Sequence, residues 1–516
     1  MRRILALSAT VVAVSLLLTG CSIPTLPAKL LSALQPTARF YQQKVVWEDC
    51  DNGMSCAMIH APLDWKHPAA GSIELAMVKH PATGTKKGSL LVDPGGPGGS
   101  GGDLVYYGLD DAVDPTLQKN FDVIGFDPRG VGQSTPVTCL SDAKLDDFLY
   151  GITPGEVGSD AWVAAKTTQA KAFARACEKQ SGALLAHLDA TSVARDMDLE
   201  RALLGEEKLD YLGYSYGSFL GTLYAGLYPK RVGHLVLDGA LDPWNLSHPG
   251  DSDYVDAPVN TEQEEAFEHE LKAFLGACLR GEERAIGTGG CSFTGTLSTA
   301  LTDVTTLLQD ADEHPLTAAD GRLLGSSTLA SAIMADLYDS SQWQDLNDLF
   351  TRVKHGDAST AFASSDNYNS RADDGSYYDN SAVSNLAIGC LEYGSDDDPT
   401  AMKDVANALE QAAPVLGKYD AYGDILCGQW PYGPADFPPP VRARGAAPIL
   451  VIGTTGDPAT PYGDAVALAK QLDSGVLLTL NGDGHTAYNK GNACIDDAVD
   501  RYLLTGKTPK SGTSCS

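Results

Sequence analysis

The stretch that decides the fold is Leu212–Gly221, "LGYSYGSFLG", in which Gly213, Ser215 and Gly217 are spaced as GxSxG. The preceding "KLDYLGY" has the pattern of a buried strand, and the following "SFLGTLYAGLYP" has that of a helix ending before Pro229. A serine between a strand and a helix is the setting of a nucleophile elbow, a strained turn that exposes the hydroxyl. We therefore predict that Ser215 is a nucleophile, with a serine in an ordinary small-residue loop as the alternative.

A serine nucleophile needs a base and a group that orients the base. Where a serine nucleophile lies at such an elbow, the three catalytic groups follow along the chain in the order Ser, then Asp or Glu, then His. Asp457 follows the apolar run "PILVIG", and His485 follows "VLLTL", so both are predicted at strand ends on the same rim as Ser215. His485 would exchange the serine proton while Asp457 fixes its tautomer. Asp238 also ends a predicted strand and remains an alternative acid.

Backbone N–H groups must stabilise the oxyanion that such a reaction forms. One donor is predicted at Tyr216, directly after the nucleophile. The other is expected from "DPGGPGGSGG", Asp93–Gly102, where residues without side chains let the backbone approach a substrate. This run lacks the lysine and the GxGxxG frame of a phosphate-binding loop.

The pattern of apolar runs predicts the architecture. Short apolar runs alternate with helix-like segments from Trp47 to Gly239 and again from Ala447 onward, which is typical of an α/β fold with a largely parallel sheet. Between them, Thr261–Gly281 is an acidic amphipathic helix, and the chain to Arg444 is polar. We predict one sheet interrupted by a large, mainly helical cap before its last strands, over the edge where such sheets bind ligands.

Several elements carry this prediction. Thr191–Gly205 is expected to be a helix, with Thr191 as its N-cap and Gly205 as its stop. A further helix is expected near Gly463–Leu472. The expected strands are Gly88–Gly96, Phe121–Gly130, Arg231–Gly239, Ala447–Pro458 and Gly475–His485.

The N-terminus has the layout of an export signal. Arg2 and Arg3 precede an apolar run, Ile4–Leu18, that is too short for a comfortable permanent membrane span. The run ends in "LTGC", which resembles a bacterial lipobox and predicts lipidation of Cys21, with an ordinary signal peptide as the alternative. The predicted segments are a signal at 1–20, a tether at 21–40, a first core part at 41–240, a cap at 241–443 and a second core part at 444–516.

The cysteine count agrees with export. Of eleven cysteines, ten remain when Cys21 is set aside, an even number for an oxidising compartment. A metal site is the alternative, but no pair has CxxC spacing and no histidine cluster lies nearby. Proximity in the chain suggests the pairs Cys50–Cys56, Cys139–Cys177, Cys278–Cys291, Cys390–Cys427 and Cys494–Cys515.

The formal charge is −30, from 37 basic and 67 acidic residues. This balance argues against nucleic acid or anionic lipid as a partner. It is explained by solubility outside the cell, or by attraction of cationic substrates such as peptide amino termini.

Six ordered motifs together resemble a known family. The chain is similar to the secreted tripeptidyl aminopeptidases of actinobacteria, relatives of proline iminopeptidases within the α/β-hydrolase fold, from about residue 45 to the end. One departure is Pro94, where proline iminopeptidases carry the histidine of HGGPG, which weakens a claim of strict proline specificity. The motifs are "DPGGPGGSG", "DPRGVGQS", "YLGYSYGSFLG", "VLDGALDP", "GTTGDPATP" and "GDGHT".

The resemblance implies an extracytoplasmic serine exopeptidase that removes short peptides, typically tripeptides, from free amino termini. It assigns the triad to Ser215, Asp457 and His485, and the oxyanion donors to Gly96 and Tyr216. It implies peptide or protein substrates. From the rest of the sequence we expect membrane attachment only through the lipid on Cys21, no cofactor or metal, and a monomer.

Family similarity also points to a carboxylate that binds the substrate ammonium, the physical answer to a free amino terminus. That residue is Glu392 in "AIGCLEY", with Glu262 and Glu265 as alternatives and a solvated acidic surface as the plainest explanation. Thr460 is expected beside the nucleophile's pocket, also by resemblance. An esterase or lipase of the same fold, or a non-catalytic binding lipoprotein, remains an alternative function.

Overall fold

The computed structural model describes residues 37–244, 261–393, 398–435 and 440–516. The expected signal at 1–20, the lipidation site Cys21 and most of the tether lie outside these ranges. Residues 38–40, predicted as the end of the tether, belong to helix α2 (Ala38–Tyr41). The Phe40 side chain holds this helix on the core, in which it is buried. The folded part of the chain therefore begins before residue 41.

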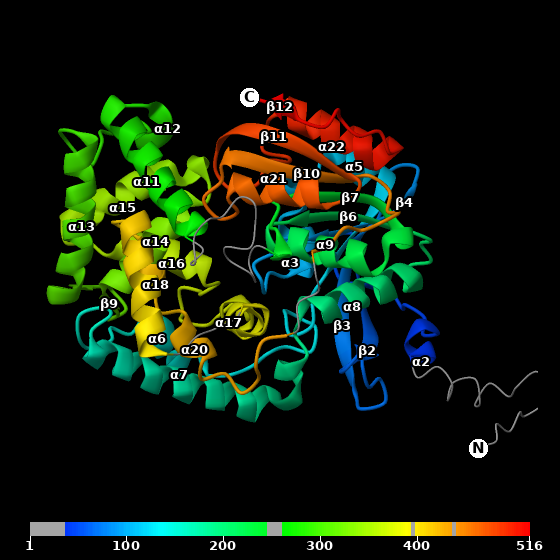
Figure 1. Cartoon of the computed structure of the whole chain (residues 1–516), viewed down its shortest axis with the longest axis horizontal. Helices are drawn as coiled ribbons and strands as arrows, with labels where there is room; N and C mark the ends of the chain where they lie inside the picture. The colour runs from blue at the N-terminus through cyan, green and yellow to red at the C-terminus, as the bar shows by residue number, and fades with distance from the viewer. Residues whose placement is uncertain (1–36, 245–260, 394–397, 436–439) are drawn as a thin grey trace, which may run out of the picture.

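A ten-stranded sheet forms the centre of the molecule, in the order β1-β2-β3-β5-β4-β6-β7-β10-β11-β12 (Figure 1). The pairs β1–β2, β2–β3 and β3–β5 are antiparallel, and the remaining neighbours are parallel, which confirms the predicted sheet. The strands are β1 (Glu48–Asp49), β2 (Ser55–Pro62), β3 (Ser72–His80), β4 (Gly88–Asp93), β5 (Phe121–Phe126), β6 (Leu209–Tyr214), β7 (Val232–Asp238), β10 (Ile449–Gly456), β11 (Gly475–Asp483) and β12 (Thr513–Cys515).

The central strands are apolar along their length because helices cover both faces of the sheet. Helices α3, α5 and α22 pack on one face, and α8, α9 and α21 pack on the other. The core helices are α3 (Gly101–Tyr107), α4 (Leu109–Ala112), α5 (Pro115–Asn120), η1 (Gly182–Ala186), α8 (Ala190–Leu203), α9 (Tyr216–Leu227), η2 (Pro229–Arg231), α21 (Tyr462–Gln471) and α22 (Ala493–Thr505).

Helix α8 corrects one prediction. Its N-cap is Asp189, whose carboxylate accepts the Ser192 N–H at 2.9 Å, and not Thr191. An aspartate caps a helix at least as well as a threonine and adds negative charge at the positive end of the helix dipole. The helix therefore starts one residue before the predicted cap, while Gly205 follows its end with φ of 80°.

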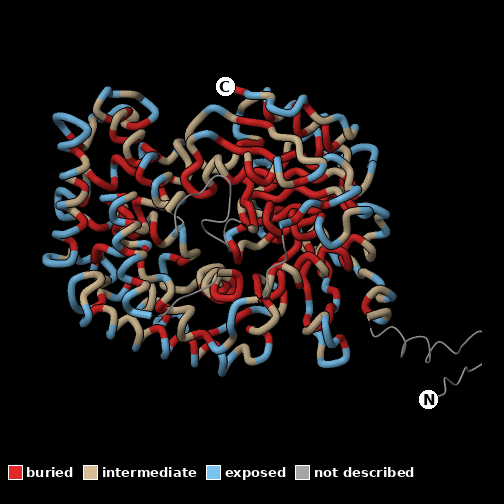
Figure 2. Tube along the Cα trace, viewed as in Figure 1, coloured by how far each residue is buried: buried red, intermediate tan, exposed pale blue. Residues whose placement is uncertain are grey.

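The cap is inserted between β7 and β10 and has its own apolar core, which includes the fully buried Trp343, Phe274 and Phe350. Figure 2 shows buried residues gathered separately in cap and sheet. The cap elements are α11 (Glu262–Arg280), α12 (Glu283–Ile286), α13 (Leu297–Glu313), β8 (Leu316–Thr317), β9 (Leu323–Leu324), α14 (Ser326–Leu337), η3 (Ser340–Gln342), α15 (Trp343–Lys354), α16 (Ser359–Tyr368), α17 (Ser381–Glu392), α18 (Pro399–Ala412), α19 (Gly417–Asp420) and α20 (Asp424–Cys427).

Two helices from the first core part join the cap (Figure 1). They are α6 (Asp142–Tyr150) and α7 (Asp160–Ser181). Trp162 of α7 packs with Met402 and Ile425 from α18 and α20, and Asp146 of α6 accepts two hydrogen bonds from Arg371, both at 2.8 Å. The cap therefore draws on a second segment of chain, outside the predicted limits 241–443.

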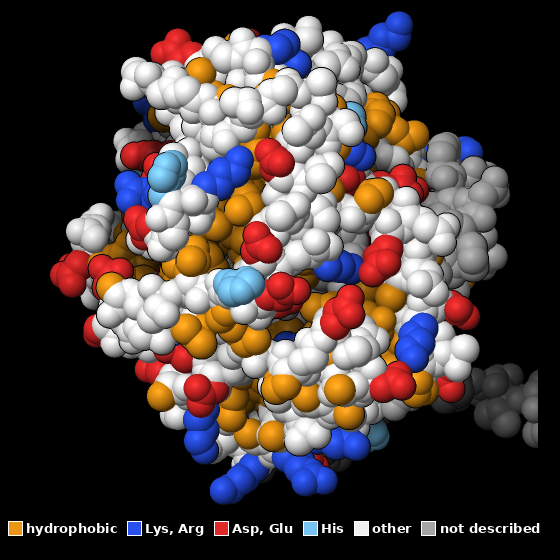
Figure 3. Space-filling view, turned by 90° about the vertical axis from the view of Figure 1, so that its left-hand side faces the viewer, with side chains coloured by type: hydrophobic (Ala, Val, Ile, Leu, Met, Phe, Trp, Pro, Cys, Tyr) orange, Lys and Arg blue, Asp and Glu red, His pale blue; other side chains and the backbone are white. Residues whose placement is uncertain are grey.

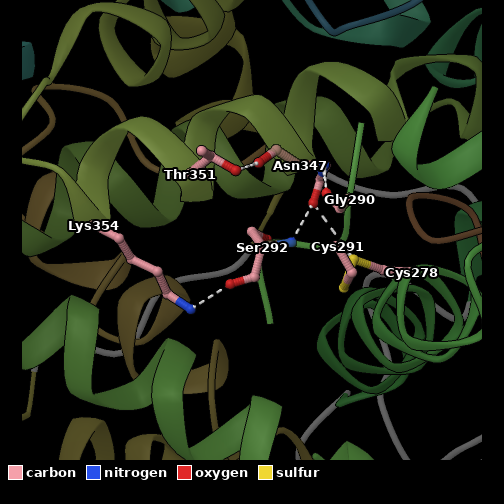
Figure 4. Close-up of a disulfide and its surroundings, with 7 residues drawn as sticks. All are labelled: Cys278, Gly290, Cys291, Ser292, Asn347, Thr351 and Lys354. Carbon is pink, nitrogen blue, oxygen red and sulfur yellow. Dashed lines mark hydrogen bonds between the residues drawn. A yellow bond between two sulfur atoms is a disulfide. The ribbon is translucent and has the colours of Figure 1, made fainter. Parts of the chain in front are cut away.

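The five predicted disulfides are all present. Cys278–Cys291 ties a cap loop to α11 (Figure 4). The Asn347 side chain on α15 holds the same loop, since its Oδ1 accepts the Ser292 N–H at 2.9 Å and its Nδ2 donates to the Gly290 carbonyl at 3.0 Å. Lys354, the last residue of α15, donates to the Ser292 carbonyl at 2.8 Å, so one disulfide and three hydrogen bonds fix the loop to two helices.

Acidic and basic side chains are interspersed with apolar ones over the cap face drawn in Figure 3. This distribution is that of a solvated surface. In the described ranges, no helix is both long enough and apolar enough to cross a bilayer.

We expect the double variant Cys278→Ser/Cys291→Ser to lower the stability of the cap by about 2–4 kcal/mol, the usual effect of opening a loop of this length. Denaturant unfolding followed by tryptophan fluorescence should show the change, because Trp343 lies in the cap core. An unfolding midpoint equal to that of the wild type would show that the hydrogen bonds from α15 hold the loop without the disulfide.

Candidate active site

Ser215 lies at a strained turn between β6, which ends at Tyr214, and α9, which begins at Tyr216. Its φ is 54° and its ψ is −124°, a conformation that non-glycine residues rarely adopt. A Cβ atom on Gly217 would lie 2.8 Å from the Asp93 Oδ1 at the end of β4. The absence of a side chain at Gly217 therefore lets the turn lie close to β4. The strained turn that the sequence predicts is present.

Asp457 and His485 are brought together at the ends of β10 and β11. The His485 Nδ1 lies 2.9 and 3.0 Å from the two carboxylate oxygens of Asp457. The Asp457 side chain is fully buried and also accepts the N–H groups of Ala459 and Thr460, at 3.0 and 2.8 Å. The carboxylate is therefore fixed in orientation and favours a proton on Nδ1, which leaves Nε2 to accept one.

Asp238, the alternative acid, has different partners. Its buried carboxylate accepts the Ala487 N–H at 3.0 Å and the Tyr488 N–H at 2.8 Å. Its backbone carbonyl accepts the Ser215 N–H at 2.8 Å. Asp238 thus joins the serine turn to the loop that follows His485, and the geometry favours Asp457 as the partner of the imidazole.

The Ser215 hydroxyl and the His485 imidazole both lie in the described ranges, and they are not hydrogen-bonded to each other in this conformation. Hydrogen bonds of this kind commonly tighten only when substrate is bound. The Asp238 contacts hold the serine turn close to the loop that follows His485.

The loop that carries Gly96 lies against the serine turn, since a Cβ atom on the preceding Gly95 would lie 2.8 Å from the Tyr216 backbone nitrogen and 3.0 Å from the Ser215 Cβ. Gly96 follows β4 with φ of 115°, and the preceding Gly95 N–H donates to the Asp93 Oδ1 at 2.8 Å. Tyr216 is the first residue of α9. Among the described residues, the N–H groups of Gly96 and Tyr216 have no acceptor, so both can bind developing negative charge.

Glu392 lies at the end of α17 and is 2% exposed. Its Oε1 accepts the Ala190 N–H and, at 3.4 Å, the hydroxyl of Tyr216. Burial raises the pKa of its carboxyl to about 8. The alternatives Glu262 and Glu265 lie in the first turn of α11.

Thr460 contacts the acid and the base directly. Its hydroxyl donates to the Asp457 Oδ2 at 2.9 Å and lies 3.2 Å from the His485 Nδ1. The side chain is 3% exposed. The structure thus positions Thr460 as a support of the Asp457–His485 pair.

A cap residue, Tyr338, and a core residue, Lys490, that sequence reasoning missed also contact the histidine. The Tyr338 carbonyl, at the end of α14, accepts the His485 N–H at 2.7 Å, and the two rings meet edge to face with centroids 5.6 Å apart. Lys490 donates to the His485 carbonyl at 2.7 Å and to Asp339 at 2.9 Å. Neither residue belongs to a motif, so nothing in the sequence signalled these contacts.

The fold and this arrangement define the class of protein, an α/β-hydrolase with a nucleophile elbow. A family model described as TAP-like protein matches residues 413–515. The chain is 33% identical to the serine protease Hip1 of Mycobacterium tuberculosis, over 99% of this chain and 98% of that protein. It is 32% identical to carboxylesterase B of M. tuberculosis (89% and 86% covered) and 29% identical to the tripeptidyl aminopeptidase of Streptomyces lividans (93% and 88%). The chain belongs to the TAP-like family of α/β-hydrolase serine peptidases.

We expect Asp457→Asn to lower kcat by about 10⁴-fold with little loss of stability, because the imidazole would lose the acceptor that sets its tautomer. Asp238→Asn should cost stability and have a smaller effect on the chemical step, since it weakens two backbone contacts. Burst kinetics with an activated ester measures the rate of the chemical step in both variants. Near-full activity of Asp457→Asn would exclude Asp457 as the orienting acid.

Asp93 generates a prediction about pH. Its carboxyl is buried, and burial raises its pKa to about 8, against about 3.9 in an unfolded chain. The folded state therefore binds this proton more tightly, so the contribution of Asp93 to stability falls as pH rises from about 4 to about 8. We expect Asp93→Asn, which keeps an acceptor for the Gly95 N–H, to become more stable relative to wild type over this range in thermal unfolding. A pH-independent difference would contradict the assignment.

Proposed function

We propose that this protein is an extracytoplasmic serine exopeptidase that releases short peptides, tripeptides in particular, from free amino termini. The observation that carries the proposal is the buried Asp457–His485 pair beside the strained Ser215 turn, in a chain of the TAP-like family.

In the proposed reaction, the Ser215 Oγ attacks the scissile carbonyl while the His485 Nε2 takes its proton. The oxyanion is stabilised by the N–H groups of Gly96 and Tyr216. His485 then returns the proton to the leaving amine, and the amino-terminal fragment stays esterified to Ser215. Water, activated by the same imidazole, releases that fragment and restores the enzyme.

Two relatives support a peptide substrate, one named serine protease Hip1 and one named tripeptidyl aminopeptidase. We assign recognition of the substrate ammonium to Glu392. The carboxyl bonds to Tyr216, next to the nucleophile, and its pKa of about 8 leaves it largely neutral at pH 7 without a partner. A bound ammonium would favour the ionised form and so lower this pKa.

The proposed location rests on the N-terminal sequence and the disulfides. Five disulfides are typical of an oxidising compartment. Export through the signal at 1–20 and attachment through a lipid on Cys21 would leave the enzyme outside the cytoplasm, as a monomer tethered to the membrane.

An esterase is the second candidate. The relative named carboxylesterase B is 32% identical over 89% of this chain, and the same triad and oxyanion donors serve any acyl transfer.

A library of free-amino-terminus peptides, analysed by mass spectrometry, tests the proposal. We expect tripeptides to accumulate with the wild type and not with Ser215→Ala. Matched ester reporters distinguish the second candidate: turnover of esters without any peptide cleavage would replace the exopeptidase proposal with the esterase.

We expect Glu392→Gln to reduce kcat/KM for free-amino-terminus peptides while hydrolysis of amino-terminally blocked peptides stays the same, because the variant removes the charge that pairs with an ammonium. Glu410→Gln, at an exposed position of α18, is the matched control and should change neither. Equal effects of Glu392→Gln on both substrates would remove Glu392 from recognition.

A further inference from the structure

Helix α17 is the cap element that contacts the oxyanion loop, residues 93–100. In Figure 1 it is seen end-on between the cap helices and the sheet core, and Figure 2 shows buried residues along it. The helix, Ser381–Glu392, lies far from the loop in the sequence. The contact therefore depends on how the cap packs on the core.

Helix α17 contacts backbone atoms of the loop. The Asn385 Nδ2 donates to the Pro97 carbonyl at 3.0 Å, and the Ser384 Oγ lies 3.5 Å from the Gly98 carbonyl. Gly98 has φ of 94°, and a Cβ atom there would lie 2.6 Å from the Ser384 Oγ and 2.8 Å from the Asn385 backbone nitrogen. The loop backbone therefore lies directly against the helix.

The rest of the loop is anchored elsewhere. Its beginning is held by Asp93, which accepts the Gly95 N–H, and its end by Ser100, whose hydroxyl donates to Asp127 at 2.5 Å. Within the described ranges, the Asn385 side chain donates to the Pro97 carbonyl. The Ser384 hydroxyl lies 3.5 Å from the Gly98 carbonyl but closer, at 3.0 Å, to the Asn380 carbonyl of its own helix. The stretch that presents the Gly96 N–H is thus supported by α17.

Helix α17 can provide this support because it is fixed at both ends. Before its first turn, the Asn380 side chain accepts the Gly132 N–H at 2.9 Å and donates to the Gly130 carbonyl at 2.8 Å. Near its end, Cys390 is bonded to Cys427 of α20, and Glu392 accepts the Ala190 N–H of the core. The helix is therefore held against the core as well as within the cap.

We propose that Asn385 is a positioning residue for the oxyanion hole: by holding the Pro97 carbonyl, it keeps the Gly96 N–H aimed at the oxyanion. The proposal rests on the proposed function only in requiring acyl transfer at Ser215. Losing an oxyanion donor costs about 10²–10³-fold in kcat. Losing the support of that donor should cost less, so we expect a decrease of about 10–10²-fold for Asn385→Ala.

The test compares Asn385→Ala and Asn385→Asp with wild type. Asparagine and aspartate have the same shape, but an aspartate would present an acceptor to the Pro97 carbonyl. The decrease in kcat should therefore be at least as large in Asn385→Asp as in Asn385→Ala. We expect kcat to fall with KM unchanged. Affinity for a peptide aldehyde, whose adduct with Ser215 occupies the oxyanion hole, should fall in parallel, while affinity for the product peptide and the melting temperature stay at wild-type values.

Asn369→Ala is the matched control, since Asn369 is a cap asparagine that donates to a carbonyl, that of Ser365 at 2.9 Å, away from the loop. It should leave all five readouts unchanged. Wild-type kcat and aldehyde affinity in both Asn385 variants would overturn the proposal, as would equal losses of aldehyde and product affinity. The rate of labelling by a fluorophosphonate reports on the same donors without a peptide, so a wild-type rate in Asn385→Ala overturns it whatever the natural substrate.

Discussion

The contacts of Asp238 are the interaction on which the site depends. This residue precedes the cap insertion, yet its carboxylate binds the N–H groups of Ala487 and Tyr488, which follow the insertion. Its carbonyl binds the Ser215 N–H. Beside it, β7 and β10 pair in parallel from Leu235 to Asp238. The two parts of the core are therefore joined beside the proposed nucleophile and base, and burial makes breaking the contact costly.

The cap contributes to both sides of this junction. Through Tyr338 it binds the backbone of His485, and through α17 it lies against the oxyanion loop. A cap that only covered the site could move without altering the groups beneath it. Here cap residues contact His485 and the glycine-rich loop that carries Gly96, so folding of the cap and geometry of the candidate site are coupled.

Local signals explain what the sequence could predict. The elbow at Ser215, the strands that end before Asp457 and His485, and the five disulfides all follow from patterns within short stretches of chain. The glycine-rich loop after β4 is recognisable for the same reason, and its oxyanion role stays a prediction. Two predictions are wrong in detail. The helices α6 and α7, predicted in the core, pack with the cap, and the N-cap of α8 is Asp189 and not Thr191. The contact between Asn385 and Pro97 joins residues 288 positions apart and leaves no local pattern, so only the folded chain shows it.

The disulfides close only short stretches, with sequence separations from 6 to 38 residues, and none bridges residues 292–389. Each pair can form as soon as its second cysteine is accessible, so three pairs need no residue beyond Cys291 and two pairs lie wholly after it. Oxidation can thus proceed from the amino terminus onward, while alignment of β10 beside β7 waits for the second part of the core. A peptide bond cut between Cys291 and Cys390 would leave two pieces associated by non-covalent contacts alone.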